Sequence, residues 1–184
     1  MPKKSEGVIN WLVNNDEIKT ILLSYYGNYF LTTSYSADHI KNKLGPSNTK
    51  ISSQDTRNQS REEIFYSGLD KTIELLLKTN KKIILSIDIP ELAFFPKDCV
   101  RKQMNCNTPI QEVMDRQAAL RAMINKLKKH YPMLLVYDPL PLFCQNNECT
   151  FQHKSGILYR DSHHLTLRGS DFYAQNFIDW LNQH

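Results

Sequence analysis

An aspartate and a histidine that can act together lie just ahead of the last predicted helix. Asp161 and His164 are three residues apart, and one turn at a helix entry can bring both side chains to the same side. The carboxylate can then accept a hydrogen bond from one ring nitrogen and leave the other nitrogen to take a proton from a hydroxyl. The spacing predicts Asp161 as the residue that fixes the tautomer and His164 as general base, then general acid.

Two other interpretations of this segment stay open. It can be a surface turn with a helix cap, in which the side chain of Ser162 caps the last helix. It can also be a metal site, since His153, His163 and His164 are all present. Their spacing matches no zinc pattern, and no acidic cluster joins them beyond Asp161. The sequence therefore predicts no metal and no cofactor.

Four cysteines form two local pairs, Cys99 with Cys106 and Cys144 with Cys149. Neither pair has the Cys-x2-Cys spacing of a zinc knuckle. Both close short polar loops, which favours two local disulfides and an oxidising compartment; four reduced thiols are the alternative. The first residues lack the apolar stretch of a signal peptide, and no apolar run approaches the roughly 18 residues of a membrane helix. The lack of a signal peptide and the paired cysteines therefore indicate different cellular compartments.

The length and composition suit one soluble domain, residues 1–184. The net charge is +4, and the lysines are scattered rather than gathered in a stripe with aromatic residues, which argues against nucleic acid as a partner. A polar stretch over 34–60 is predicted to be a long loop. Apolar periodicity predicts helices over 6–14, 61–79, 109–130 and from about 166, and strands over 18–23, 83–87 and 133–137.

Strands that are apolar on both faces alternate with long helices, and this pattern predicts a parallel sheet covered by helices. Active sites in such sheets lie at the carboxyl ends of the strands. Functional residues are therefore expected just after Leu23, Ile87 and Tyr137.

The segment around Asp161 and His164 resembles the last block of the SGNH hydrolase family. More narrowly, the chain from about Glu17 onward resembles the SGNH domain fused behind membrane acyltransferase-3 proteins, which modify bacterial surface sugars. The similar motifs lie at 21–26, 88–92 with Cys99, 138–139, Cys144 with Cys149, 159–165 and Gly169. The resemblance implies a three-layer α/β/α sandwich with a mainly parallel, flavodoxin-like sheet, and it supports the two disulfides.

The chain departs from the family at the nucleophile. The family's serine lies in a Gly-Asp-Ser block after the first strand, and neither that block nor a Gly-x-Ser-x-Gly elbow occurs here. The resemblance then implies a partial SGNH domain that lacks its first strand or strands. Asn28, after the strand over 18–23, is the candidate oxyanion donor.

The resemblance implies acyl transfer or ester hydrolysis on cell-surface carbohydrate such as lipopolysaccharide, by an O-acetyltransferase or esterase that forms a serine acyl-enzyme. Its implied partners are an acyl donor, a carbohydrate acceptor and a membrane acyltransferase domain, and its implied location is the periplasm. As an isolated chain the protein is expected to be inactive. The alternatives are a non-catalytic remnant or a module of the same fold that binds glycan or protein.

Overall fold

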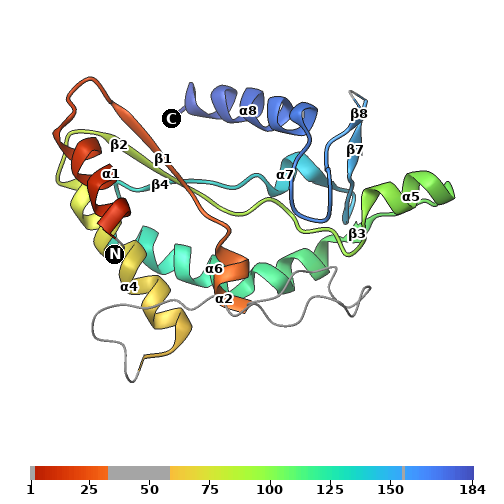
Figure 1. The fold of residues 1–184 in the computed structure, drawn as a ribbon, viewed down its shortest axis with the longest axis horizontal. Coiled ribbons are helices and arrows are strands. Elements are labelled where there is room, and N and C mark those ends of the chain that lie inside the picture. The colour runs from red at the N-terminus through yellow and green to blue at the C-terminus, as the bar shows by residue number, and fades with distance from the viewer. Residues whose placement is uncertain (1–2, 33–58, 155) are drawn as a thin grey trace. The chain divides into compact units, whose positions relative to one another are not determined.

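Helices alternate with strands from α4 to α7, and four short strands precede α8, in this computed structural model, which describes residues 3–32, 59–154 and 156–184 (Figure 1). The predicted loop over 34–60 lies outside the described residues except for its last two positions. The larger elements are α1 (Lys3–Asn14), β1 (Thr20–Ser24), α2 (Gly27–Thr32), α4 (Arg61–Leu77), β2 (Lys82–Ser86), α5 (Pro96–Lys102), α6 (Ile110–His130), β4 (Leu135–Tyr137), α7 (Leu140–Phe143) and α8 (Leu167–Leu181). The short strands are β3 (Thr108–Pro109), β5 (Cys144–Gln145), β6 (Glu148–Cys149), β7 (Gln152–His153) and β8 (Gly156–Ile157).

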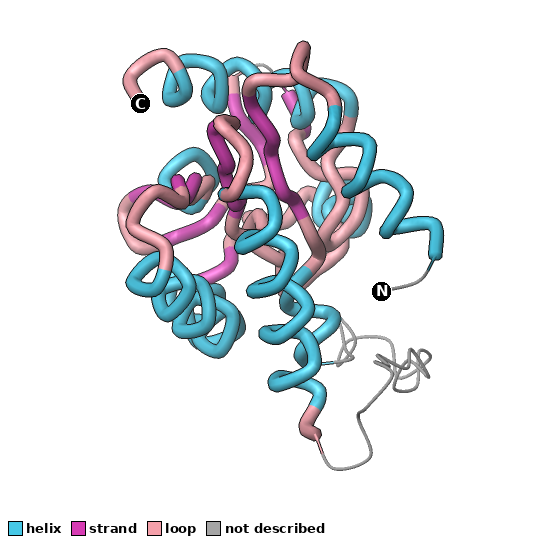
Figure 2. Tube along the Cα trace, turned by 90° about the vertical axis from the view of Figure 1, so that its left-hand side faces the viewer, coloured by secondary structure: helices cyan, strands magenta, loops and turns pink. Residues whose placement is uncertain are grey.

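The predicted parallel sheet is present. Its strands follow the order β1-β2-β4, and both pairings are parallel. Ile21 pairs with Ile83 in one register, and Leu85 pairs with Val136 in the other. The strands run alongside one another in magenta in Figure 2, with cyan helices next to them. The chain is therefore a mixed α/β protein, as the sequence predicts.

Burial differs between the two longer strands of the sheet. In β2, residues 83–86 are all buried, as expected for a strand covered on both faces. In β1, Ile21 and Leu23 are buried, but Leu22 between them is 38% exposed. An apolar run indicates a strand that is apolar on both faces, and it does not show whether both faces are covered.

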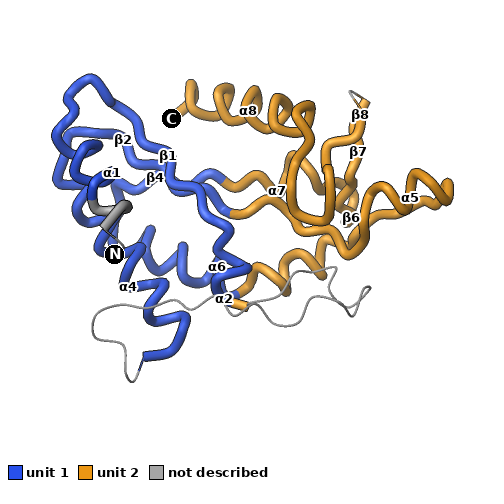
Figure 3. Tube along the Cα trace, in the orientation of Figure 1, with its two compact units in different colours: residues 1–31, 48–87, 119–137 blue, residues 32–47, 88–118, 138–184 orange. Residues whose placement is uncertain are grey.

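The chain divides into two compact units, drawn in two colours in Figure 3. The first consists of residues 1–31, 48–87 and 119–137, and the second of residues 32–47, 88–118 and 138–184. The first unit contains the parallel sheet, and its core is formed by β1 and β2 with apolar side chains of α4 and the second half of α6. Ile73, Leu76 and Leu127 are fully buried there.

Polar residues set the ends of the two long helices. Ser60 caps α4: its side chain accepts from the backbone N–H of Glu63, and the Glu63 carboxylate accepts from the backbone N–H of Ser60. This reciprocal capping box satisfies two N–H groups that the first turn leaves open. In α6, Glu112 lies in the first turn and Lys128, Lys129 and His130 in the last, the charge order that the helix dipole favours.

The second unit has its own apolar core, built around aromatic and sulfur-containing side chains. Its fully or nearly fully buried members are Leu92, Cys99, Val113, Phe143, Cys144, Cys149, Phe151, Leu158 and Tyr159. The rings of Phe143 and Tyr159 meet edge to face, with centroids 5.4 Å apart, an arrangement favoured by their quadrupoles. Tyr159 is therefore a core residue immediately ahead of the predicted acid–base pair.

The cysteines are joined as their spacing predicts, Cys99 to Cys106 and Cys144 to Cys149. The second disulfide links β5 to β6. These two strands form a hairpin with a two-residue loop, Asn146 and Asn147, both of which have positive φ. Asparagine tolerates that backbone region, so the local sequence suits the tight turn. Among the described residues, no helix is long and apolar enough to cross a membrane.

The disulfides generate the first prediction. Replacing Cys144 and Cys149 together by alanine should lower the free energy of unfolding by about 2 kcal/mol, because the unfolded chain regains the entropy of a short closed loop. Urea denaturation of the variant and of wild-type protein, both expressed in an oxidising compartment, measures this difference in the free energy of unfolding. Mass spectrometry of non-reduced peptides should recover both pairs, and finding four alkylatable thiols would contradict the pairing.

Candidate functional site

Residues 159–165 form a short closed turn in the second unit. Tyr159 and Leu165 pair as an antiparallel bridge, and the backbone N–H of Arg160 donates to the carbonyl oxygen of His164 at 2.8 Å. The N–H of Thr166 donates to the carbonyl oxygen of Leu158, also at 2.8 Å. These bonds bring the two ends of the turn together, so its central residues must project from a fixed base.

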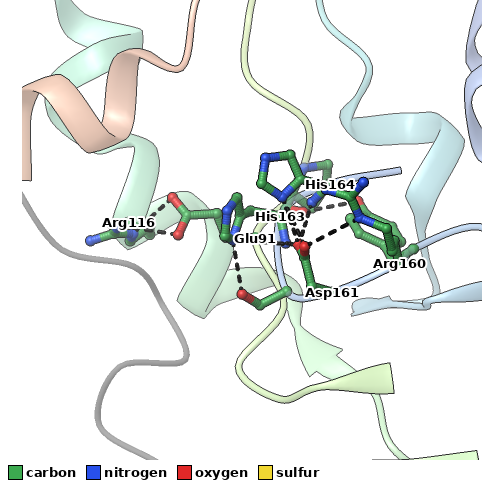
Figure 4. A network of polar contacts seen from close by, with 9 residues as sticks. Glu91, Arg116, Arg160, Asp161, His163 and His164 are labelled. Atoms are coloured by element: carbon green, nitrogen blue, oxygen red, sulfur yellow. Dashed lines mark hydrogen bonds and ion pairs between the residues drawn. The ribbon is translucent and has the colours of Figure 1, made fainter. Parts of the chain in front are cut away.

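Asp161 is the hydrogen-bond acceptor at the centre of this turn (Figure 4). Its Oδ1 accepts the backbone N–H groups of His163 at 3.0 Å and His164 at 2.8 Å. Its Oδ2 lies 2.8 Å from Nδ1 of His164. An ionised carboxylate only accepts, so this contact places the ring proton on Nδ1 and leaves Nε2 with a lone pair. The contact predicted from the Asp-x-x-His spacing is present, and its catalytic role stays a prediction.

The surroundings of Asp161 favour its charged form. Burial alone raises the pKa of this carboxyl. The hydrogen bonds from the backbone N–H groups of His163 and His164, the bond from the His164 ring and the nearby His163 ring outweigh burial, and the pKa lies below its ordinary value. Asp161 therefore stays an anion at neutral pH, as an orienting residue must. The His164 side chain is 53% exposed, so solvent reaches its ring.

Ser162 does not cap the last helix, contrary to the sequence interpretation. It is buried, and its Oγ lies 3.0 Å from Nδ1 of His163. Thr166 is the N-cap of α8: its side chain accepts from the N–H of Gly169 at 3.0 Å and donates to the carbonyl oxygen of Ile157 at 2.8 Å. The cap has to precede the first helical turn directly, and Ser162 is too far upstream.

Two hydrogen bonds, one from a side chain and one from the backbone, tie the turn to the segment after β2. The hydroxyl of Tyr159 donates to the carbonyl oxygen of Pro90 at 2.9 Å. The N–H of Leu92 donates to the carbonyl oxygen of Ser162 at 2.8 Å. Burial, and then the charge of Glu91, raises the pKa of Tyr159 well above its usual value, so this hydroxyl remains a donor. The segment 90–92, called the supporting segment below, thus holds the turn of residues 159–165 in place.

A buried ion pair, which the sequence reasoning missed, holds that supporting segment against α6. Glu91 is 2% exposed, and both of its oxygens lie 3.1 Å from nitrogens of Arg116, a bidentate contact that Figure 4 shows. Gln117, next to it on α6, is fully buried and donates to the carbonyl oxygen of Asp88 at 3.0 Å. The partners are 25 residues or more apart, so no local spacing revealed them.

Gly169 lets α8 begin close to the strand that leads into the turn. A Cβ atom at this position would collide with the carbonyl oxygen of Leu158. Backbone cannot yield as a flexible side chain does, so only glycine permits this approach. The cap at Thr166 and the contact at Gly169 together fix where α8 starts.

The other predicted residues have different surroundings. Asn28 lies in α2 and is 1% exposed. It belongs to the first unit, whereas Asp161 and His164 belong to the second, so its role as an oxyanion donor stays a prediction. Among the described residues, Asp161, His163 and His164 form a group whose potential metal-ligating atoms lie within 4.8 Å of one another. His153 is not part of that group.

Comparison with known proteins points to one family. Residues 2–179 match the family model described as the SGNH domain fused to AT3 domains. Among solved structures, the chain is similar to the periplasmic domain of a lipopolysaccharide acetyltransferase from Salmonella ser. Paratyphi A, with a TM-score of 0.58 and 14% sequence identity. The similarity covers 96% of this chain and 61% of that one. No curated protein matches the sequence significantly.

Asp161 generates a prediction about pH. Its pKa is lowered in the folded state, so its charge contributes stability above the unfolded pKa of about 3.9. That contribution is lost as the pH falls through the folded pKa. The variant Asp161→Asn should therefore be less stable than wild type at pH 7, and the difference should shrink below about pH 4.

Urea denaturation at both pH values measures this effect. Arg160→Gln is the control, since Arg160 is exposed and its Nε lies 3.6 Å from Oδ2 of Asp161; an exposed ion pair is worth at most about 1 kcal/mol. Equal stability of Asp161→Asn and wild type at pH 7 would show that the carboxylate does not hold the turn.

Gly169 generates a prediction about packing. Gly169→Ala should lower the free energy of unfolding by about 2 kcal/mol or more, because the new Cβ collides with backbone. Gly68→Ala is the matched control: Gly68 lies inside α4, and a Cβ there meets nothing within 4 Å. The control should gain about 0.5–1 kcal/mol from helix propensity. A Gly169→Ala variant as stable as wild type would refute the close approach.

Proposed function

Because the chain belongs to the family of SGNH domains fused to AT3 domains, we propose that it performs acyl transfer to cell-surface carbohydrate through a serine acyl-enzyme. The observation that carries the proposal is the 2.8 Å contact between Oδ2 of Asp161 and Nδ1 of His164. This contact sets the tautomer that a general base needs. The similar periplasmic domain belongs to a protein described as a lipopolysaccharide acetyltransferase, which supports a surface polysaccharide as the acceptor.

In the proposed reaction, Nε2 of His164 takes the proton of the serine hydroxyl as its oxygen attacks the acyl carbonyl. The imidazolium that forms is stabilised by the Asp161 carboxylate and then protonates the leaving group of the donor. In the second half, His164 takes the proton of a sugar hydroxyl, whose oxygen attacks the acyl-enzyme. The serine leaves and recovers its proton from His164, and the acylated sugar is released.

The nucleophile in this proposal comes from outside the 184 residues, which contain no Gly-Asp-Ser and no Gly-x-Ser-x-Gly. Asn28 is the proposed donor to the oxyanion. The two disulfides fit the oxidising periplasm, and the family description supports a membrane acyltransferase domain as the partner that delivers the acyl group.

The second candidate is a non-catalytic module that binds glycan or protein. The missing nucleophile motif favours it, since a base with no hydroxyl to deprotonate performs no acyl transfer. The two candidates differ in what happens when a chain that carries Gly-Asp-Ser is joined to these residues.

The isolated chain should hydrolyse p-nitrophenyl acetate no faster than imidazole at equal concentration, because its sequence contains neither of the motifs that present an activated serine. A fluorophosphonate probe should leave it unlabelled. Stoichiometric labelling would contradict this expectation, and the labelled peptide would identify a nucleophile within the 184 residues.

The coding sequence upstream of residue 1 provides the decisive experiment. A longer chain that includes an upstream Gly-Asp-Ser should be labelled on that serine and should transfer acyl groups. Its His164→Ala variant should lose at least about 10⁴-fold in rate. His153→Ala is the matched control, because it removes a histidine of the same unit outside the pair. A longer chain that folds but neither labels nor turns over would favour the binding module.

A further inference from the structure

Asp161, His163 and His164 present three different ligand side chains on one turn. One potential ligand atom from each lies within 4.8 Å of the other two. The rings of His163 and His164 are adjacent, with centroids 4.1 Å apart, and both have Nδ1 near the same carboxylate. The sequence predicted no metal because the histidine spacing matches no zinc pattern, but spacing does not show where the ring nitrogens gather.

The separations around Asp161 match those between ligands of a tetrahedral ion. With metal–ligand bonds of about 2.0–2.2 Å, two ligand atoms lie about 3.4 Å apart. Oδ1 of Asp161 is 3.1 Å from Nδ1 of His164 and 3.6 Å from Nδ1 of His163. Shifts of a few tenths of an ångström, which side chains make without moving the backbone, bring both separations to that value.

The backbone already holds the carboxylate in place for this purpose. Oδ1 of Asp161 accepts the N–H groups of His163 and His164, and these two bonds use only part of the roughly four lone-pair sites that the two carboxylate oxygens offer. Hydrogen bonds of this kind orient the ligands of metal sites.

Access and competing contacts also permit an ion. The side chains of Asp161 and His164 are 29% and 53% exposed, so an ion can enter and keep a water ligand. Arg160 is near the carboxylate, but its side chain is 68% exposed and can turn away into solvent. The hydroxyl of Ser162, 3.0 Å from Nδ1 of His163, can rotate its hydrogen away from a ligated nitrogen.

We propose that Asp161, His163 and His164 bind one divalent transition-metal ion of the class that takes imidazole and carboxylate ligands, with Zn²⁺ as its representative. The bound ion takes the place of the Nδ1 proton of His164. The only proton of that ring then resides on Nε2, where it removes the lone pair that accepts protons. The metal-binding proposal does not depend on acyl transfer. Inhibition of acyl transfer by the bound ion, which follows from the loss of the Nε2 lone pair, rests on the proposed function.

Titration of the 184-residue chain without a polyhistidine tag tests the site. Zn²⁺ should bind in a one-to-one ratio by calorimetry, and Co²⁺ should produce the visible absorption of a tetrahedral site. His163→Ala should weaken Zn²⁺ binding at least about tenfold. His153→Ala should leave it unchanged, since His153 lies outside the group. Circular dichroism of both variants checks that they remain folded.

His163→Ala is the most informative variant, because the His163 ring neither donates nor accepts a proton in the proposed acyl transfer. Ring NMR signals of His163 and His164, but not of His153, should shift on addition of Zn²⁺. The proposal is overturned if wild type binds neither ion, if His163→Ala binds as tightly as wild type, or if His153→Ala weakens binding equally. None of these outcomes depends on catalysis, so failure of the metal site is distinguishable from failure of the acyltransferase proposal.

Discussion

The Asp161 carboxylate determines the shape of the turn of residues 159–165 by accepting three N–H groups at once. Two belong to the backbone of His163 and His164, and the third to the ring of His164. The first two set the backbone of the turn, and the third sets the direction of the ring. Because one side chain does both, the position of His164 and its tautomer are determined together.

That carboxylate can orient His164 only if the turn itself has a fixed place. The supporting segment supplies it through Tyr159 and Leu92, and the Glu91–Arg116 pair anchors the segment on α6. A buried ion pair contributes little net stability because desolvation offsets its attraction, although removing one partner is costly. The pair is better understood as a device of geometry: its bidentate contact permits one arrangement of the segment against the helix.

The sequence predicted the features that depend on neighbours along the chain. The Asp-x-x-His spacing predicted the contact within the turn, the cysteine spacing predicted the disulfides, and apolar runs predicted the three strands of the sheet. It failed where distant residues decide. Glu91 and Arg116 lie 25 residues apart in the sequence and form their contact in the fold. The apolar run of β1 likewise does not show that Leu22 is 38% exposed. The start of the last helix was predicted correctly, but its cap is Thr166, directly ahead of the first turn, and not Ser162 four residues upstream.

Proton transfer and metal binding make opposite demands on one nitrogen of His164. A general base needs the proton on Nδ1, directed at Asp161, so that Nε2 keeps its lone pair. A metal ligand must be deprotonated at the atom that binds, and an ion at Nδ1 leaves the proton on Nε2. The two proposed states therefore exclude each other. In these proposals Asp161 takes part in both states, His164 changes its tautomer between them, and the His163 ring is a ligand only in the metal-bound one. The His163 ring, as a ligand of the ion alone, thus distinguishes the two proposed states. The hydrogen bond between Nδ1 of His164 and Asp161 belongs to the proton-transfer state, and Nδ1 of His163 lies 3.6 Å from the same carboxylate.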